Sequence, residues 1–315
     1  MPSALSKAQA TLLCQVVGDS LGSLVEFESA QTISVKYPDG VRYLADGGTY
    51  ETLAGQPTDD SELALLLARE LATRNEYNPQ VMRERYRYWL DSKPFDCGRT
   101  TSRGILGNPD LDSQANGALM RVSPLGIFGA KYDLQKVFDW AVEDAKLTHP
   151  NLICLQVNAL YALGISKAIQ EDITSRELHD YLSIVASDFA TDQVFSVFVQ
   201  SISNPPPDFM ANMGWVITAF WNALYQMLHA PSLEAGIVDT VNRGGDTDTN
   251  GAIAGALLGA IYGMEAVPQD WKDTVLQCKP SKDNPRSKKP RPQCFWPCDV
   301  LDLATKLLGD IPNGQ

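Results

Sequence analysis

The sequence is short of positive charge. It has 26 Lys and Arg against 38 Asp and Glu, which gives a formal net charge of -12. A general nucleic-acid-binding protein carries a basic surface, so this balance argues against nucleic acid as a partner. The excess acid has two possible roles, as solvated surface or in part as ligands for metal ions.

Long hydrophobic runs are also missing. The most apolar later stretch, 251–264, has 14 residues, fewer than the roughly 20 that span a bilayer. The first twenty residues are interrupted by Gln9, Gln15 and Gly18, which does not fit a signal peptide. The six cysteines are scattered, and without an export signal they are expected to be thiols. We therefore expect a cytoplasmic protein with no membrane contact.

Histidine is scarce, and this decides against one kind of enzyme. The order Gly18-x-Ser20-x-Gly22 fits a nucleophile elbow, and Ser20 would then need a histidine base with an acidic partner. The chain has three histidines, His149, His179 and His229, with none after residue 229. A serine hydrolase is therefore the weaker interpretation.

Sustained alternation of period two is hard to find, apart from a weak strand possibility at 33–44. Apolar spacing near 3.6 residues dominates instead and predicts helices. Besides the segments that begin near residues 8 and 59, the predicted helices are 79–90, 134–146, 151–169, 176–188, 192–202, 211–229, 233–242, 250–263 and 299–308. The sequence therefore predicts an all-α fold.

One loop differs from the rest of the chain in charge. Residues 279–292 contain six Lys and Arg, one Asp and four Pro. Such a basic, proline-rich segment is either a solvated mobile loop or a docking patch for an acidic partner. It does not divide the chain, and we expect a single domain over 1–315.

Two predicted helices begin with acidic residues. Thr58-Asp59-Asp60 precedes a run of strong helix formers, and Gly245-Asp246-Thr247-Asp248-Thr249 opens another helix almost 190 residues later. Carboxylates in a first turn interact favourably with the helix dipole, and Thr58 can cap. Converging hard oxygen ligands would suit Mg²⁺ or Mn²⁺. Two ordinary helix starts and one shared metal site both remain open on spacing alone.

Glycine spacing favours the shared site. Gly251, Gly255, Gly259 and Gly263 recur every four residues in the predicted helix after the second acidic segment. A glycine inside a helix costs about 1 kcal/mol relative to alanine. Four on one face are explained if another backbone or a ligand approaches closely, and Gly18 with Gly22 could supply the facing groove.

Taken together, six blocks resemble the ADP-ribosylglycohydrolases, which include the dinitrogenase-reductase-activating glycohydrolase. They stand in that family's order: Gly18-Asp19-Ser20-Leu21-Gly22 with Glu26-Phe27, Gly55-Gln56-Pro57-Thr58-Asp59-Asp60, Asn116-Gly117-Ala118-Leu119-Met120-Arg121, Thr148-His149-Pro150, Arg243 to Asn250, and Phe295-Trp296-Pro297. Each block alone is weak, but their order along the chain is specific.

The resemblance implies a compact all-α domain with a dinuclear metal centre. It implies two Mg²⁺ or Mn²⁺ ions bound by Thr58, Asp59, Asp60, Asp246, Asp248 and Thr249, with Asp60 and Asp246 also serving catalysis. Glu26 would lie beside the metals as an acid, base or gating carboxylate. Asn116, Gly117 and Met120 would line the ADP-ribose cleft, with His149 near it. Gly245 lies in a glycine turn whose backbone N–H groups could bind the pyrophosphate.

Two functional hypotheses follow. In the first, the protein is a metal-dependent hydrolase that removes ADP-ribose from a modified protein, by cleaving the N-glycosidic bond to arginine. In the second, it is an immunity protein that counters an ADP-ribosyltransferase toxin by reversing its modification or by occluding it. The partner is an ADP-ribosylated protein in the first case and the cognate transferase or toxin in the second.

Overall fold

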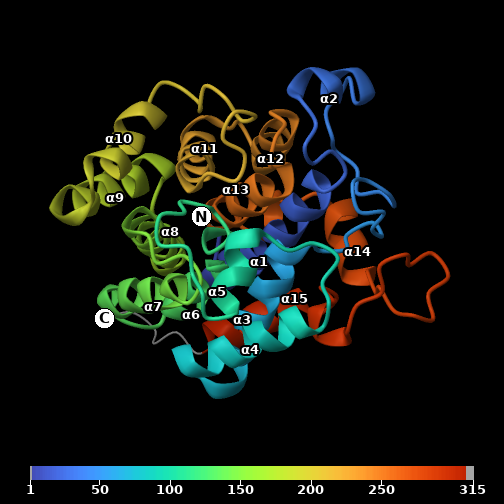
Figure 1. The fold of residues 1–315 in the computed structure, drawn as a ribbon. Helices are drawn as coiled ribbons and strands as arrows, with labels where there is room; N and C mark the ends of the chain where they lie inside the picture. Colours follow the sequence, from blue (N-terminus) through green and yellow to red (C-terminus); the bar gives the residue numbers. More distant parts are fainter. Residues whose placement is uncertain (1, 310–315) are drawn as a thin grey trace.

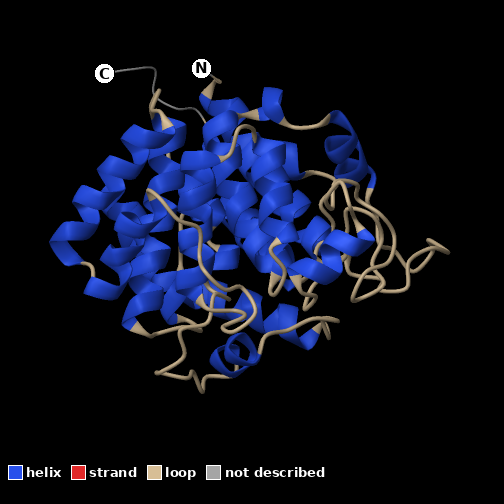
Figure 2. Cartoon of the chain, turned by 90° about the horizontal axis from the view of Figure 1, so that it is seen from above, coloured by secondary structure: helices blue, strands red, loops and turns tan. Residues whose placement is uncertain are grey.

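The computed structural model describes residues 2–309, so residue 1 and residues 310–315 of the expected domain lie outside the described part. Within the described part there are fifteen α-helices and no β-strand, which confirms the all-α fold (Figure 2). The helices are α1 (Ala4–Gly22), α2 (Ala30–Lys36), α3 (Asp59–Arg74), α4 (Pro79–Asp91), α5 (Arg99–Ile105), α6 (Ser123–Gly129), α7 (Leu134–Lys146), α8 (Leu152–Gln170), α9 (Ser175–Phe189), α10 (Asp192–Ser201), α11 (Val216–His229), α12 (Leu233–Asn242), α13 (Thr247–Tyr262), α14 (Gln269–Gln277) and α15 (Val300–Leu308).

The first helix and the thirteenth form the centre of the molecule (Figure 1). They pack backbone to backbone, because a Cβ atom added at Gly18 would lie 2.0 Å from the carbonyl oxygen of Gly251. A Cβ atom at Gly255 would lie 2.2 Å from the carbonyl oxygen of Cys14. The glycine spacing therefore predicted this seam correctly. Because α1 and α13 come from opposite halves of the chain, both halves contribute to one core.

Both central helices are surrounded by other helices. Helices α8, α11 and α12 cover α13, and α15 packs on α1. Helix α8 has the length and hydropathy of a membrane span, but 83% of its apolar window is buried inside the protein. It is therefore a core helix of this bundle.

Two local predictions were wrong. The expected strand at 33–44 is instead helix α2 followed by a loop, because Ser29 caps the helix by accepting from the backbone N–H of Thr32 at 3.2 Å. The expected helix 211–229 begins only at Val216. Gly214 before it has a left-handed φ of +78° and accepts the backbone N–H of Asn116 at 2.9 Å. The segment 211–215 is therefore a loop beside the site described below.

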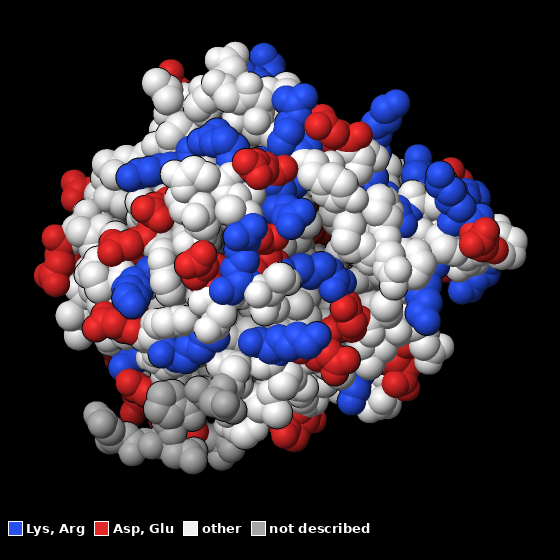
Figure 3. Space-filling view, turned by 90° about the horizontal axis from the view of Figure 1, so that it is seen from below, with Lys and Arg blue, Asp and Glu red and all other residues white. Residues whose placement is uncertain are grey.

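The basic loop 279–292 is anchored at both its middle and its end. The guanidinium of Arg291 is buried and donates to both carboxylate oxygens of Glu62 in α3, at 2.7 and 2.8 Å. Arg286 forms an ion pair with Asp46 at 3.3 Å. The loop protrudes at one side in Figure 1, and basic side chains gather at the same side in Figure 3.

Candidate metal centre

The two acid-bearing helix starts lie on one cavity of about 380 Å³. The cavity is bounded by the N-terminal ends of α3 and α13, the turn after α1, and the loops around residues 96–101, 115–117 and 213–214. Of the predicted residues, Glu26, Asp59, Asn116, Gly117, Met120, His149, Asp246, Asp248 and Thr249 line it. Thr58 and Asp60 are fully buried at the start of α3 and do not line the cavity.

The start of α3 is capped from another helix. The side chain of Thr58 makes no capping bond, contrary to the prediction. Asp19 of α1 caps instead, because its carboxylate accepts the backbone N–H groups of Thr58 and Ser61 at 3.0 Å each. The Thr58 hydroxyl lies 2.9 Å from both Asp19 and Asp60. This arrangement fixes the Asp60 carboxylate against α1, and sequence reasoning had assigned no role to Asp19.

The start of α13 is fixed by two different contacts. Asp246 accepts a hydrogen bond from the side-chain amide of Asn116 at 2.7 Å. Asp248 accepts the backbone N–H of Thr249 at 2.8 Å. Each carboxylate keeps one oxygen outside these bonds, so both can still bind a ligand in the cavity.

Gly245 does not serve as predicted. Its N–H donates to the carbonyl oxygen of Glu28 at 3.0 Å, and its carbonyl oxygen accepts from Phe27 at 2.8 Å. A Cβ atom at Gly245 would lie 2.1 Å from the carbonyl oxygen of Phe209. The glycine is therefore needed for a close turn, and its N–H is not available to a pyrophosphate.

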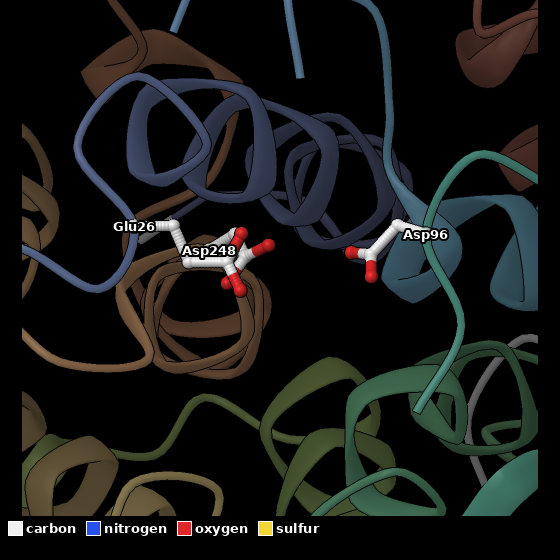
Figure 4. A group of neighbouring side chains, drawn as sticks. All are labelled: Glu26, Asp96 and Asp248. Carbon is white, nitrogen blue, oxygen red and sulfur yellow. The ribbon is translucent and has the colours of Figure 1, made fainter. Parts of the chain in front are cut away.

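A carboxylate that the sequence analysis missed also points into the cavity. Single oxygens of Glu26, Asp96 and Asp248 lie within 4.8 Å of one another. Glu26 and Asp248 lie side by side, and Asp96 faces them across a gap (Figure 4). Asp96 follows no recognisable motif and lies in a loop between α4 and α5, so its position depends on the folded chain alone.

The electrostatics of this cluster require counter-charge. Burial raises the pKa of Glu26 to about 8, and the neighbouring Asp96 and Asp246 carboxylates add to the shift. Burial and the same kind of repulsion raise the pKa of Asp59, Asp60 and Asp248 well above the usual range. The two buried arginines of the described chain are already paired elsewhere, Arg121 with Asp144 and Arg291 with Glu62.

The donor set fits divalent cations. Oxygen Oε2 of Glu26 and oxygen Oδ1 of Asp60 are buried and have no hydrogen-bond partner among the described residues. Buried polar atoms in proteins are nearly always paired, so two orphaned carboxylate oxygens in one cluster point to a ligand. Oxygen-only ligands suit Mg²⁺ or Mn²⁺ better than Zn²⁺.

Ser20 is excluded as a nucleophile by its surroundings. Its side chain is 2% exposed and its hydroxyl oxygen accepts the backbone N–H of Gly55 at 3.0 Å. It therefore holds the loop before α3 in place. This agrees with the sequence analysis, in which the shortage of histidine argued against a serine nucleophile.

Comparison with known proteins shows the family and the fold of this chain. A sequence model of the ADP-ribosylglycohydrolase family matches residues 1–308. The ADP-ribosyl-[dinitrogen reductase] glycohydrolase of Rhodospirillum rubrum is 30% identical over 290 residues, covering 86% of this chain and 90% of that protein. The ADP-ribosylarginine hydrolase Tri1 of Serratia proteamaculans is 23% identical, covering 87% and 76%. A solved ADP-ribosylglycohydrolase-related protein complex has a chain with a TM-score of 0.78 and 25% identity, covering 97% of this chain and 98% of that one.

The fold and the site together define an all-α bundle with a carboxylate-lined cavity between two helix starts, where a group of acidic side chains could hold a metal ion. The chain belongs to the ADP-ribosylglycohydrolase family, as its sequence blocks suggested.

Proposed function

We propose that this protein uses two Mg²⁺ or Mn²⁺ ions to remove ADP-ribose from an ADP-ribosylated protein. The observation that supports this most directly is the cluster of buried carboxylates around one cavity, with two orphaned oxygens. Asp59, Asp246, Asp248 and Thr249 line the cavity and would hold the ions from its surface. Thr58 and Asp60 are buried at the start of α3 and would complete the ligand set from beneath it.

When bound, the two ions would supply Lewis-acid polarisation of the ribose hydroxyls and of the attacking water. The residues of the chain supply position and charge. Asn116 holds the Asp246 carboxylate in one orientation, and Asp19 together with Thr58 holds the start of α3. Glu26 lies on the cavity with an oxygen that no protein group occupies. It can therefore transfer a proton to or from the departing group, as glycoside hydrolysis requires.

Arginine is the proposed acceptor residue. Asp96 and Glu26 face each other at the cavity, and neither forms an ion pair with a lysine or arginine of the described chain. A guanidinium group would satisfy carboxylates in this position through charge-assisted hydrogen bonds. The name of the Serratia relative, an ADP-ribosylarginine hydrolase, supports the same linkage.

A substrate panel tests both parts of this proposal. The protein is incubated with arginine-linked, serine-linked and nucleic-acid-linked ADP-ribose in turn, with and without chelator, and free ADP-ribose is measured. We expect release from the arginine linkage, and none after chelation. Release from the serine linkage alone would overturn the acceptor assignment, and full release in chelator would overturn the metal assignment.

Reversal of a toxin's modification would use this same site, so that hypothesis needs its own test. A cognate transferase that is inhibited equally by the wild type and by Asp246→Ala would indicate occlusion. Inhibition that is lost in the variant would indicate reversal.

The cytoplasmic location stays a prediction from the thiols.

A further inference from the structure

Behind the cavity lies a buried charged network that the proposed reaction does not use. Arg121 and Asp144 are both 0% exposed, and the Arg121 Nε atom donates to Asp144 Oδ2 at 3.0 Å. The hydroxyl of Tyr86 donates to the other Asp144 oxygen at 2.8 Å. A buried ion pair contributes little net stability compared with apolar residues of the same volume. Stability alone therefore does not explain this pair, and the groups that it holds in position are of interest.

One nitrogen of Arg121 connects the pair to the wall of the cavity. Its Nη1 atom donates to the carbonyl oxygen of Gly117 at 3.1 Å and to the hydroxyl oxygen of Thr148 at 2.9 Å. The Thr148 hydroxyl in turn lies 2.7 Å from Nδ1 of His149. Gly117 and His149 both line the cavity. The guanidinium therefore holds two adjacent parts of that wall.

The direction of each hydrogen bond follows from the chemistry of the groups. A guanidinium can only donate, so Thr148 must accept from Arg121. The single hydrogen of the Thr148 hydroxyl then has one acceptor among the described residues, the Nδ1 atom of His149. A hydrogen on Nδ1 would leave the hydroxyl hydrogen buried without an acceptor, which costs about 1–3 kcal/mol.

The other ring nitrogen has no protein partner. His149 is 0% exposed, and its Nε2 atom is without a hydrogen-bond partner among the described residues. A Cβ atom added at Gly117 would lie 3.0 Å from Cε1 and 3.1 Å from Nε2 of His149, so the ring edge that carries Nε2 faces Gly117 in the cavity wall. Burial and the nearby Arg121 charge lower the pKa of His149 to about 3, so the ring is neutral near pH 7.

We propose that Arg121 and Thr148 are positioning residues that fix the hydrogen of His149 on Nε2, so that the ring donates a hydrogen bond to an oxygen of bound ADP-ribose. The identity of the ligand rests on the proposed function. The placement of the hydrogen on Nε2 does not rest on the proposed function, because it follows from the hydrogen bonds of Arg121, Thr148 and His149. A neutral donor of this kind suits a phosphate or hydroxyl oxygen, both of which accept hydrogen bonds.

The position of the hydrogen can be read without ligand. Long-range ¹H–¹⁵N spectra of the histidine rings distinguish a protonated Nε2 from a protonated Nδ1. We expect His149 to show the Nε2–H form in the wild type and in Thr148→Ser, which keeps the hydroxyl. Thr148→Val has nearly the same shape but no hydroxyl, and its ring should show a mixture of both forms.

Binding of free ADP-ribose tests the consequence. We expect the dissociation constant to rise on the order of tenfold in Thr148→Val and to stay near the wild-type value in Thr148→Ser. Thr11→Val is the matched control, because Thr11 is equally buried, its hydroxyl donates to the Lys7 carbonyl oxygen at 2.8 Å, and it does not line the cavity. It should lose stability without losing affinity.

Two results would overturn the inference. The first is an Nδ1–H form of His149 in the wild type, and the second is unchanged ADP-ribose affinity in Thr148→Val. Failure of the proposed function has a different signature. The wild type would then show the Nε2–H form but bind no ADP-ribose. In that case the positioning of the His149 hydrogen would be correct and the assigned ligand would be wrong.

Discussion

At the scale of single residues, the carboxylates of the cavity lower the stability of the fold but provide groups that can bind a ligand. Each buried acid in the cluster raises the pKa of its neighbours, and no lysine or arginine of the described chain offsets them. Such local costs are typical of functional sites. Substitutions in the cluster should therefore change activity and stability in opposite directions.

Asp248→Asn is the clearest case. It removes one charge from the cluster and one proposed metal ligand, so we expect ADP-ribose release to fall at least about a hundredfold. The melting temperature of the metal-free protein should rise, because Asp248 is repelled by Glu26, Asp60 and Asp246. Asp239→Asn, on the partly exposed pair with Arg243, is the matched control and should change neither. A drop in metal-free stability in Asp248→Asn would contradict this account.

Asp19 has a structural rather than a ligand role. Asp19→Ala removes the cap of α3 and leaves two buried backbone N–H groups unpaired, so we expect the free energy of unfolding to fall by about 2–4 kcal/mol. Urea denaturation measures this loss. Asp133→Ala, at the exposed cap of α7, is the comparison and should cost less. Equal losses in the two variants would argue against Asp19 as the cap.

Some residues of the site could be predicted from the sequence and others could not. The acidic helix starts and the Asn116, Gly117 and His149 blocks were visible because each stands in a local motif. Asp96 and Asp19 were not, because one lies in an irregular loop and the other caps a helix 40 residues away. Gly245 was misassigned because its N–H is used by the carbonyl oxygen of Glu28, a contact that forms only in the fold.

At the scale of elements, α1 and α13 pack backbone to backbone at Gly18, Gly251 and Gly255. This close packing fixes where the acidic start of α13 lies. Gly255→Ala would place a methyl group 2.2 Å from the carbonyl oxygen of Cys14, and backbone atoms cannot move away cheaply. We expect the free energy of unfolding to fall by about 2–4 kcal/mol, with weaker metal binding because α13 shifts.

The control is Gly164→Ala, within α8. A Cβ atom there would lie 3.1 Å from the end of the Leu182 side chain, which can rotate, and 4.0 Å from the end of Leu257, an ordinary contact. The exchange also gains helix propensity. Its stability should change by less than about 1 kcal/mol. Equal destabilisation in both variants would contradict the claim that the close contact between α1 and α13 requires glycine at position 255.

Most helices were predictable because apolar period and capping residues agree. The prediction for 134–146 matches α7 in full, and α12 matches 233–242. Short helices such as α5 and α6 were missed since they have too few turns to show a period. The loop 211–215 was predicted as helix because the left-handed conformation of Gly214, which precedes the true helix start, cannot be read from the sequence.

At the scale of the whole molecule, the buried carboxyl groups should make the metal-free protein less stable as pH rises through the neutral range. In the fold the pKa of Glu26 is raised to about 8 and that of Asp19 to about 7. The folded state then holds protons that the unfolded chain loses above about pH 4. Because the folded state binds more protons at these carboxyl groups, they lower the free energy of unfolding as pH rises from about 4 to 8. Burial lowers the pKa of His149 to about 3, and this ring offsets part of the loss below about pH 6.5.

Divalent cations should reverse this loss. We expect added Mg²⁺ to raise the melting temperature more at about pH 8 than at about pH 5, since protons already neutralise the cluster at the lower pH. Thermal unfolding at both values, with chelator or Mg²⁺, checks it. A larger effect of Mg²⁺ at the lower pH would contradict the counter-charge role of the cluster.

The central proposal is that the starts of α3 and α13 would hold two divalent cations, and that the hydrolysis requires both. The most direct test is to remove metal from the protein, add Mn²⁺ in steps, and follow ADP-ribose release from an arginine-linked substrate. The account predicts no release at the start and full activity at two equivalents of Mn²⁺ per chain. Full activity in the metal-free protein, or saturation at one equivalent, would contradict it.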